Sequence, residues 1–314
     1  MEIEPCLAPG AVGGILVERE AVVEPWLVSI GYAQAAKRAG ATIVTGQHVV
    51  GAKGGSHGWT LTTKQGDEFK CDVVVNCAGL YADDVERLRD AEHRDFEIKP
   101  RRGQFVVLQP GPGLHLNHII APVPNRVTKG VQSFQSVWGN IIVGPTAVEQ
   151  VSRDDRTCDA ATRSALLKLA TQRLGPEHAG RWAVAGEYVG IRPATEHQDY
   201  QIKKREGQNW ITVGGIRSSG LSGASGIAEY VGNVLLDGQD GPAPHCSGIS
   251  DAVVNQVPAV SNVKMAPAIP DLHTLAAQFQ ERGDGTLEID GTRWLVTHPI
   301  TQIGLRSMRL SPGA

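Results

Sequence analysis

A glycine-rich turn between a short apolar strand and a helix constrains this chain more than any other sequence feature. Residues 209–213 predict a strand that ends at Gly214 and Gly215. The apolar residues that follow recur at helical spacing: Ile227, Val231, Val234 and Leu235. Such a turn presents backbone N–H groups, at the positive end of a helix, to an anion or to the polar edge of a cofactor. An ordinary strand-to-helix connection of an α/β protein explains the pattern equally well.

Composition limits the class of protein. At 314 residues the chain is long enough for one large domain or two ordinary ones. Hydrophobic residues make up 41% and charged residues 20%, which is typical of a globular chain. Lys and Arg are scattered and the net charge is −3, so we expect no nucleic-acid partner. No apolar run reaches about 18 residues, so we expect no transmembrane segment.

The five cysteines are widely spaced, and the sequence contains no C-x-x-C. This pattern supports neither a zinc site nor an iron–sulfur cluster, so we expect no metal. It favours a reducing compartment. The first ten residues carry neither a signal peptide nor an Arg-rich transit segment, and we predict a cytoplasmic or mitochondrial location.

The first part of the chain alternates helix and strand patterns. A helix is predicted over 25–39, with a proline at its first turn, followed by short strands at 41–46 and 47–52. A polar turn at 64–67 predicts a hairpin. Its second strand ends in the apolar run 73–75, which is typical of a strand buried on both faces.

Small residues at 76–79 end that strand, and a helix is predicted over 81–89. The carboxyl end of a buried strand is where open α/β sheets bind ligands. Cys77 lies in this segment and is either a small buried residue or a nucleophile. The first alternative is favoured because no base is nearby in the sequence.

From about residue 96 the pattern becomes antiparallel. Strand-like segments separated by Pro and Gly turns lie at 101–110, 118–124, 127–136 and 139–147. A helix capped by Asp159 or Thr157 follows and ends at Gly175. Residues 237–248 and 257–270 are predicted to be irregular, 271–282 to form a helix, and Asp290 with Gly291 to form a hairpin turn.

Cationic side chains are the main candidates for chemistry. Arg192 precedes a proline in an apolar strand, where a charge must be paired or functional. Its planar guanidinium can bind a carboxylate or phosphate through two parallel hydrogen bonds, and a salt bridge to Glu187 or Glu196 is the alternative. Arg217 lies inside the glycine-rich turn and flanks whatever that turn holds. His197 is either a base or a surface histidine.

Common catalytic motifs are absent from the sequence, which contains no G-x-G-x-x-G, P-loop, H-E-x-x-H or G-x-S-x-G. Ser218 and Ser219 lie beside glycine, but no histidine is placed to activate them. We therefore interpret both serines as turn hydroxyls.

Six separated segments nevertheless resemble, in family order, the FAD-dependent D-amino-acid-oxidase-like superfamily. Its glycerol-3-phosphate dehydrogenase and L-2-hydroxyglutarate dehydrogenase branch is the most similar. The segments are 21–51, 71–88, 96–110, 137–147, 190–197 and 213–232. The resemblance covers about residues 3–236 and implies a mixed α/β fold, in which an antiparallel β-rich substrate domain is inserted into a discontinuous FAD-binding domain. The implied divisions are an FAD-binding domain at 1–95, a substrate-binding domain at 96–185, a return segment at 186–236 and a C-terminal extension at 237–314.

The resemblance also implies roles for individual residues. Arg192 falls where the family's G-x-R-P arginine holds the carboxylate or phosphate of the substrate, and Arg217 is the second residue expected at the catalytic centre. The positions that match the family's FAD contacts are Val49, Cys77, Ala78, Gly79, Gly215, Ile216, Arg217, Ser218, Ser219, Gly220 and Leu221. The implied reaction is hydride transfer from a small anionic substrate to FAD. A quinone, another acceptor or oxygen then takes the electrons.

Two departures from the family pattern matter. The family opens with a strand, G-x-G-x-x-G and a helix, and this sequence contains no such segment. The expectation is an N-terminally truncated FAD-dependent dehydrogenase or oxidase. The alternative is a catalytically inactive carboxylate- or phosphate-binding module derived from the substrate domain. Residues 237–314 contain only Cys246, so no iron–sulfur cluster of the kind found in some relatives is expected.

Overall fold

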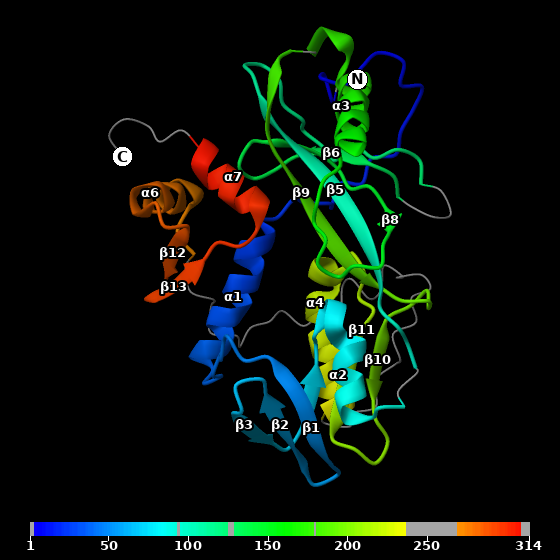
Figure 1. Cartoon of the computed structure of the whole chain (residues 1–314). Coiled ribbons are helices and arrows are strands. Elements are labelled where there is room, and N and C mark those ends of the chain that lie inside the picture. The colour runs from blue at the N-terminus through cyan, green and yellow to red at the C-terminus, as the bar shows by residue number, and fades with distance from the viewer. Residues whose placement is uncertain (1–2, 93–94, 125–128, 179, 237–268, 309–314) are drawn as a thin grey trace. The chain divides into compact units, whose positions relative to one another are not determined.

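The computed structural model describes residues 3–92, 95–124, 129–178, 180–236 and 269–308. The chain forms two compact units, whose elements are labelled in Figure 1. The first contains Met1–Ala39, Pro100–Ile191 and Pro267–Ala314, and the second contains Gly40–Lys99 and Arg192–Ala266. The four divisions implied by the resemblance stay a prediction. Of the two segments predicted to be irregular, 237–248 lies outside the described residues, and so does 257–270 apart from its last two residues.

The first unit is built on a five-stranded sheet. Its strands are β5 (Lys99–Pro110), β6 (Gln132–Gln135), β7 (Ile141–Gly144), β8 (Val148–Glu149) and β9 (Trp182–Ala194). Four of them lie in the order β6-β7-β5-β8, and β9 also pairs with β5. Antiparallel pairing joins β5 to β7 and β8, and β6 to β7. The predicted antiparallel region is therefore confirmed.

Helix α3 (Ala160–Leu174) shares an apolar core with this sheet. Asp159 caps the helix by accepting a hydrogen bond from the Thr162 N–H at 2.8 Å, which decides between the two predicted caps. The buried residues Leu166, Ala170 and Leu174 pack with Val106, Leu108, Ile141 and Val143. Gly175, with φ of +87°, ends the helix, and a short 3₁₀ turn, η2 (Pro176–His178), follows.

A second core of this unit joins segments far apart in the sequence. Helix α1 (Pro25–Arg38) packs with α6 (Leu272–Arg282), β12 (Thr286–Ile289), β13 (Thr292–Leu295) and α7 (Pro299–Ser307). The buried Gln34 donates from Nε2 to the Ile289 carbonyl at 2.7 Å. The predicted helices at 25–39 and 271–282 and the hairpin turn at Asp290 are confirmed. Helix α7 is not among the sequence predictions.

The second unit contains two three-stranded sheets. One is antiparallel in the order β1-β2-β3, with β1 (Val49–Gly55), β2 (Gly58–Thr63) and β3 (Glu68–Cys71). The other has the order β10-β11-β4, with β10 (Gln201–Lys204), β11 (Trp210–Gly214) and β4 (Val74–Asn76). The turn η1 (Gly79–Tyr81) and α2 (Ala82–Arg89) follow β4, whereas α4 (Gly220–Glu229) and the π-helical η3 (Tyr230–Leu236) follow β11. Helix α2 packs against β1, β4 and β11.

Two strand predictions are wrong. Residues 41–46 form no strand, and Ile43 and Val44 are 42% and 51% exposed. β-Branched residues favour a strand only where a partner strand and a packed face are present. The segment 118–124 contributes a single bridge, between Ile120 and Ser133, because its two prolines lack the N–H that a ladder requires.

The apolar run 73–75 is buried on one face, not on both as predicted. Val74 is 8% exposed, whereas Val73 is 37% and Val75 is 40% exposed. Helix α2 packs against the face that carries Val74 and Asn76, and strand side chains alternate between the two faces.

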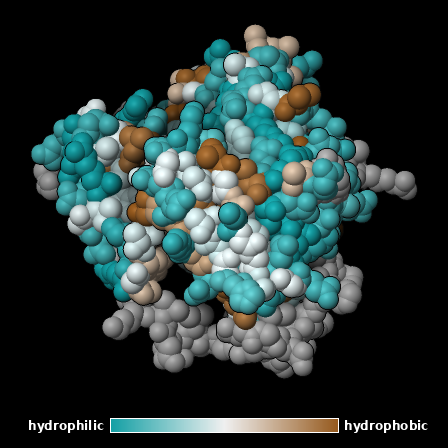
Figure 2. All heavy atoms as spheres, turned by 60° about the horizontal axis from the view of Figure 1, so that its bottom comes forward, coloured by the Kyte–Doolittle hydropathy of each residue, from teal (hydrophilic) through white to brown (hydrophobic). Residues whose placement is uncertain are grey.

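Hydrophilic residues cover most of the face shown in Figure 2, with hydrophobic residues in smaller groups between them. Among the described residues, no helix combines the length and the apolar character that crossing a membrane requires. Nor does the described part of the chain contain a group of three His, Cys, Asp or Glu side chains able to hold a metal ion.

Candidate functional site

Two turns leave neighbouring parallel strands of the second unit. Strand β11 runs parallel to β4, with Thr212 opposite Asn76. Residues 77–79 and 215–221 follow these strands, so they leave the sheet at the same edge. This edge is where open α/β sheets bind ligands. The structure therefore brings together the two segments for which the resemblance implies flavin contacts.

The side chain of Asn76 fixes the first turn. It is buried, and its Nδ2 donates to the Ala82 carbonyl at 2.9 Å. Its Oδ1 accepts from the Ala78 N–H at 3.1 Å. Gly79 adopts a φ of +57°, in the left-handed region that favours glycine. One amide side chain thus spans the turn from the end of β4 to the start of α2.

The buried carboxylate of Glu86 ties α2 to both parallel strands. Its Oε1 accepts from Trp210 Nε1 at 2.8 Å, Thr212 Oγ1 at 2.6 Å and Asn76 Nδ2 at 2.9 Å. Arg205 Nη2 lies 3.1 Å from its Oε2. Desolvation raises the pKa of this carboxyl, but the three hydrogen bonds and the Arg205 charge outweigh it, so the pKa is lowered. Glu86 is therefore a buried carboxylate that stays ionised at neutral pH.

The glycine-rich turn holds a demanding backbone conformation. Gly215 has a φ of +66°, and Arg217, although not a glycine, has a φ of +58°. A Cβ on Gly215 would lie 3.2 Å from Thr195 Cγ2, so space as well as conformation favours glycine there. Ser219 occupies the N-cap position of α4, but its side chain makes no capping hydrogen bond.

These features fit the polar edge of a flavin. N–H groups that Ser219 does not cap lie at the N-terminus of α4, the positive end of the helix dipole. Arg217 adds a further donor, because its Nε is buried and makes no hydrogen bond with any described residue. Donors of this kind match carbonyl oxygens and ring nitrogens that accept hydrogen bonds.

The division between the two units falls within β9, after Ile191. Arg192, near the carboxyl end of this strand, therefore belongs to the second unit, as do both turns. The two carboxylates considered as salt-bridge partners are engaged elsewhere. Glu187 pairs with Arg163 at 3.5 Å, and Glu196 accepts from the Glu97 N–H at 3.0 Å. The anion-binding role of Arg192 stays a prediction.

Two other candidates have structural explanations. His197 Nε2 lies 2.8 Å from the Asp95 carbonyl oxygen, and its side chain is 45% exposed, which favours the surface alternative over a base. Desolvation raises the pKa of the Cys77 thiol, so it stays protonated at neutral pH. A protonated thiol is a poor nucleophile, but Cys77 is exposed, so the prediction of a small buried residue is wrong.

Val49 is not grouped with the two turns. It begins β1, in the antiparallel sheet, which packs against α2. The structure thus groups Cys77, Ala78 and Gly79 with Gly215, Ile216, Arg217, Ser218, Ser219, Gly220 and Leu221 at one sheet edge.

The sequence predictions contain neither the Asn76–Glu86 network nor a contact between Tyr200 and Ser219. Glu86 lies on the buried face of α2 with Ala82 and Asp83, so an acidic residue in line with a buried alanine was the available signal. The sequence carries no such signal for Tyr200, because its neighbouring residues do not distinguish it from an ordinary strand residue.

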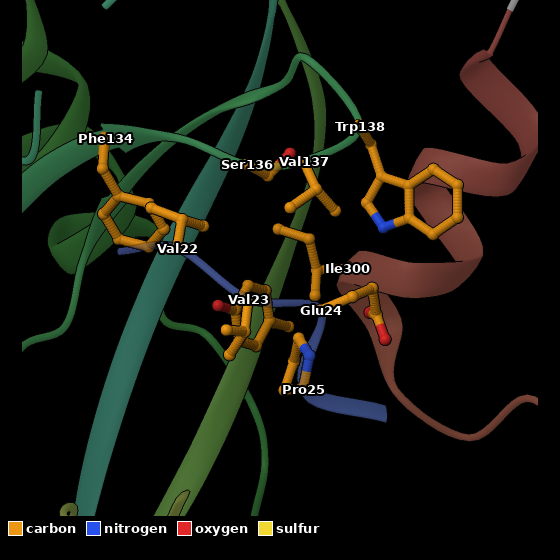
Figure 3. A pocket seen from close by; sticks show the side chains of 10 residues that line it. Val22, Val23, Glu24, Pro25, Phe134, Ser136, Val137, Trp138 and Ile300 are labelled. Carbon is orange, nitrogen blue, oxygen red and sulfur yellow. The ribbon is translucent and has the colours of Figure 1, made fainter. Parts of the chain in front are cut away.

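A cavity of about 110 Å³ lies in the first unit (Figure 3). Its mostly apolar lining is Val22, Val23, Glu24, Pro25, Phe134, Ser136, Val137, Trp138, Tyr188 and Ile300, none of which is a predicted site residue. Glu24 is 7% exposed and caps α1 by accepting from the Leu27 N–H at 2.7 Å. The Thr301 hydroxyl donates to its other carboxylate oxygen.

Replacing Glu24 with glutamine is expected to remove a pH-dependent loss of folding stability. Burial raises the pKa of Glu24, although hydrogen bonds from Thr301 and Leu27 oppose the rise. The folded state therefore holds the proton more tightly, and the wild type loses stability as the pH rises through the raised pKa. Urea unfolding near pH 4 and pH 7 should show the stability of Glu24→Gln, relative to wild type, increasing from the lower pH to the higher. An equal difference at both pH values would contradict this.

The chain is similar to known flavoenzymes. The family model described as FAD dependent oxidoreductase matches residues 1–234. A glycerol 3-phosphate dehydrogenase of Caloramator mitchellensis is 28% identical over 236 residues, 75% of this chain and 48% of that protein. An L-2-hydroxyglutarate dehydrogenase of Escherichia coli K12 is 30% identical over 145 residues, 46% of this chain and 34% of that protein. The chain thus spans about half the length, or less, of these relatives.

The chain is also similar to a flavoenzyme whose structure has been solved. Dithionite-reduced L-alpha-glycerophosphate oxidase of Mycoplasma pneumoniae with FAD bound matches with a TM-score of 0.58 and 28% identity, over 68% of this chain and 56% of that one. The mixed helix and sheet fold expected from the resemblance is confirmed. Because the family model covers well over half of its residues, the chain belongs to the FAD dependent oxidoreductase family.

Proposed function

We propose that this chain carries the flavin-ring side of an FAD site, together with the substrate-binding arginine of a dehydrogenase or oxidase. The substrate class is a hydroxy acid or a glycerol 3-phosphate-type anion. The observation that carries the proposal is the meeting of residues 77–79 and 215–221 at the carboxyl edge of β4 and β11. Relatives that act on glycerol 3-phosphate and L-2-hydroxyglutarate support the substrate class.

In this proposal the residues of the chain bind and orient the substrate and the flavin. The Arg192 guanidinium holds the carboxylate or phosphate of the substrate through two hydrogen bonds. The N–H groups of the glycine-rich turn and Arg217 hold the polar edge of the flavin, and residues 77–79 lie along it. When bound, FAD supplies the two-electron acceptor for the hydride of the substrate carbon, and a quinone, another acceptor or oxygen reoxidises it. The substrate hydroxyl releases its proton to water as the carbonyl forms. The cytoplasmic or mitochondrial location stays a prediction.

A flavin titration tests this assignment. Because the sequence contains no G-x-G-x-x-G to bind the pyrophosphate, we expect FAD and riboflavin to bind with affinities within about threefold of each other. Quenching of flavin fluorescence on addition of the chain measures both dissociation constants. Anaerobic addition of glycerol 3-phosphate or L-2-hydroxyglutarate should then bleach the visible flavin band.

The same experiment distinguishes an active oxidoreductase from an inactive binding module. Flavin binding with bleaching by one of the two substrates would support the oxidoreductase. Absence of flavin binding, together with calorimetric binding of either anion, would instead favour an inactive carboxylate- or phosphate-binding module. Bleaching by D-2-hydroxyglutarate as readily as by the L-isomer would argue against a positioned substrate.

A further inference from the structure

The cavity of the first unit is formed by four separate parts of the chain. Its walls come from the segment 22–25, from β6 and the turn after it, from β9 and from α7 (Figure 3). Val23 and Val137 are 52% and 36% exposed, whereas Trp138 and Ile300 are buried. The two valines therefore lie where the cavity meets solvent, and the tryptophan and isoleucine lie where it meets the core.

Aromatic contacts hold two of the walls in place. The Tyr188 ring stacks on Phe105, with ring centres 4.4 Å apart and an angle of 6° between the planes. His298 packs against the same tyrosine at 5.6 Å. A Cβ added to Gly304 would overlap the Trp138 indole, so α7 lies directly against that ring. The cavity is thus already formed in the chain alone, as ligand sites usually are.

Ser136 brings an unpaired polar atom to this cavity. Its N–H donates to the Asn140 carbonyl at 2.8 Å, and its carbonyl accepts from the Gly139 N–H at 2.9 Å, so the β6–β7 turn fixes its backbone. Its Oγ is buried and makes no hydrogen bond with any described residue. A buried hydroxyl without a partner lowers folding stability, and a ligand oxygen that accepts its proton would remove that loss.

The charges of the lining favour a neutral ligand. None of the lining residues is a lysine or arginine, and the carboxyl of Glu24 is among them, so an anion would be repelled. The two oxygens of Glu24 already accept hydrogen bonds from the Leu27 N–H and the Thr301 hydroxyl. Burial raises the pKa of the Tyr188 hydroxyl, which therefore stays protonated and uncharged at neutral pH.

We propose that this cavity binds a small neutral molecule with an apolar body and one oxygen atom that accepts a hydrogen bond from the Ser136 hydroxyl. A cavity of about 150 Å³ takes benzene, so one of about 110 Å³ takes a molecule of about six non-hydrogen atoms or fewer. The site goes beyond the function proposed above, because neither Arg192 nor the two turns line it.

Three probes of similar size and different polarity test the proposal. They are cyclopentanone, benzene and butyrate, and the NMR signal of the Trp138 indole N–H, assigned with Trp138→Phe, reports their binding. We expect cyclopentanone to bind with a dissociation constant on the order of 1 mM. Benzene should bind about tenfold more weakly, because it cannot accept the hydrogen bond. Butyrate should bind more weakly still, since its charge would be buried without a cation.

Ser136→Ala identifies the anchor of the ligand. It should weaken cyclopentanone binding about tenfold and leave benzene binding within about twofold of wild type. Ser164→Ala is the matched control, because Ser164 is an exposed serine of the same unit, whose hydroxyl donates to the Ala160 carbonyl at 2.9 Å. It should change neither affinity.

Three results would overturn the proposal. One is equal binding of cyclopentanone and benzene, which would show a purely apolar cavity. Another is an equal loss of both affinities in Ser136→Ala, which would show that the variant changes the shape of the cavity. The third is no saturable shift with any probe, which would show that the cavity holds only water. Flavin binding has no part in this test, so its outcome is independent of the function proposed above.

Discussion

Glu86→Ala is expected to lower the free energy of unfolding of the second unit by about 3 to 5 kcal/mol. The carboxylate is fully buried and accepts hydrogen bonds from Trp210, Thr212 and Asn76, so its removal leaves three buried donors without their acceptor. It also leaves the charge of Arg205 without this partner. Thermal and urea unfolding followed by circular dichroism measure the loss.

A surface carboxylate provides the control for Glu86. Glu149 also pairs with an arginine, Arg101 at 2.9 Å, but its side chain is 77% exposed. Exposed pairs contribute little, so Glu149→Ala should cost less than about 1 kcal/mol. Equal losses for the two variants would show that burial of the Glu86 network does not stabilise this unit.

The lowered pKa of Glu86 adds a pH dependence. Desolvation is the largest influence and raises the pKa, but the hydrogen bonds from Thr212, Asn76 and Trp210 and the Arg205 charge lower it below the usual value. The stabilisation is therefore present above the usual carboxyl pKa and is lost as the pH falls through the lowered one. Glu86→Gln should unfold with a flatter pH dependence than wild type on the acid side.

Local rules account for the elements that the sequence predicts well. Helix α1 begins at Pro25, whose missing N–H costs nothing at the first turn, and Glu24 caps it. The β12–β13 hairpin follows from Asp290 and Gly291, both with positive φ. The antiparallel region follows from alternating segments divided by turns. In each case the deciding interactions lie within a few residues.

Contacts between distant segments explain what the sequence does not reveal. Residues 41–46 have strand composition, but no described strand pairs with them. Glu86 accepts hydrogen bonds from Trp210 and Thr212, and the Tyr200 hydroxyl contacts that of Ser219, nineteen residues further along the chain. The meeting of residues 77–79 with 215–221 requires the parallel register of β4 and β11, which no local pattern encodes. Only the family resemblance placed those two segments at one site.

Substitution of Arg192 is the prediction that bears most directly on function. Arg192→Ala is expected to weaken binding of glycerol 3-phosphate or L-2-hydroxyglutarate about a hundredfold, because charge-assisted hydrogen bonds are each worth about 1.5 to 3 kcal/mol. Arg192→Lys keeps the charge but loses the planar pair of donors, so about a tenfold loss is expected. Isothermal titration calorimetry with each anion measures both.

Two comparisons make the Arg192 result specific. Arg87 is a half-exposed arginine of the same unit that pairs with Asp84 at 2.7 Å, and Arg87→Ala should leave anion binding within about twofold of wild type. Glycerol, which lacks the phosphate, should bind all of these proteins equally weakly. If Arg192→Ala kept the affinity of the wild type while its thermal unfolding was unchanged, Arg192 would not be the anion ligand. The substrate charge would then be held by another cation, and Arg217, whose Nε is buried beside the glycine-rich turn, would be the next residue to substitute.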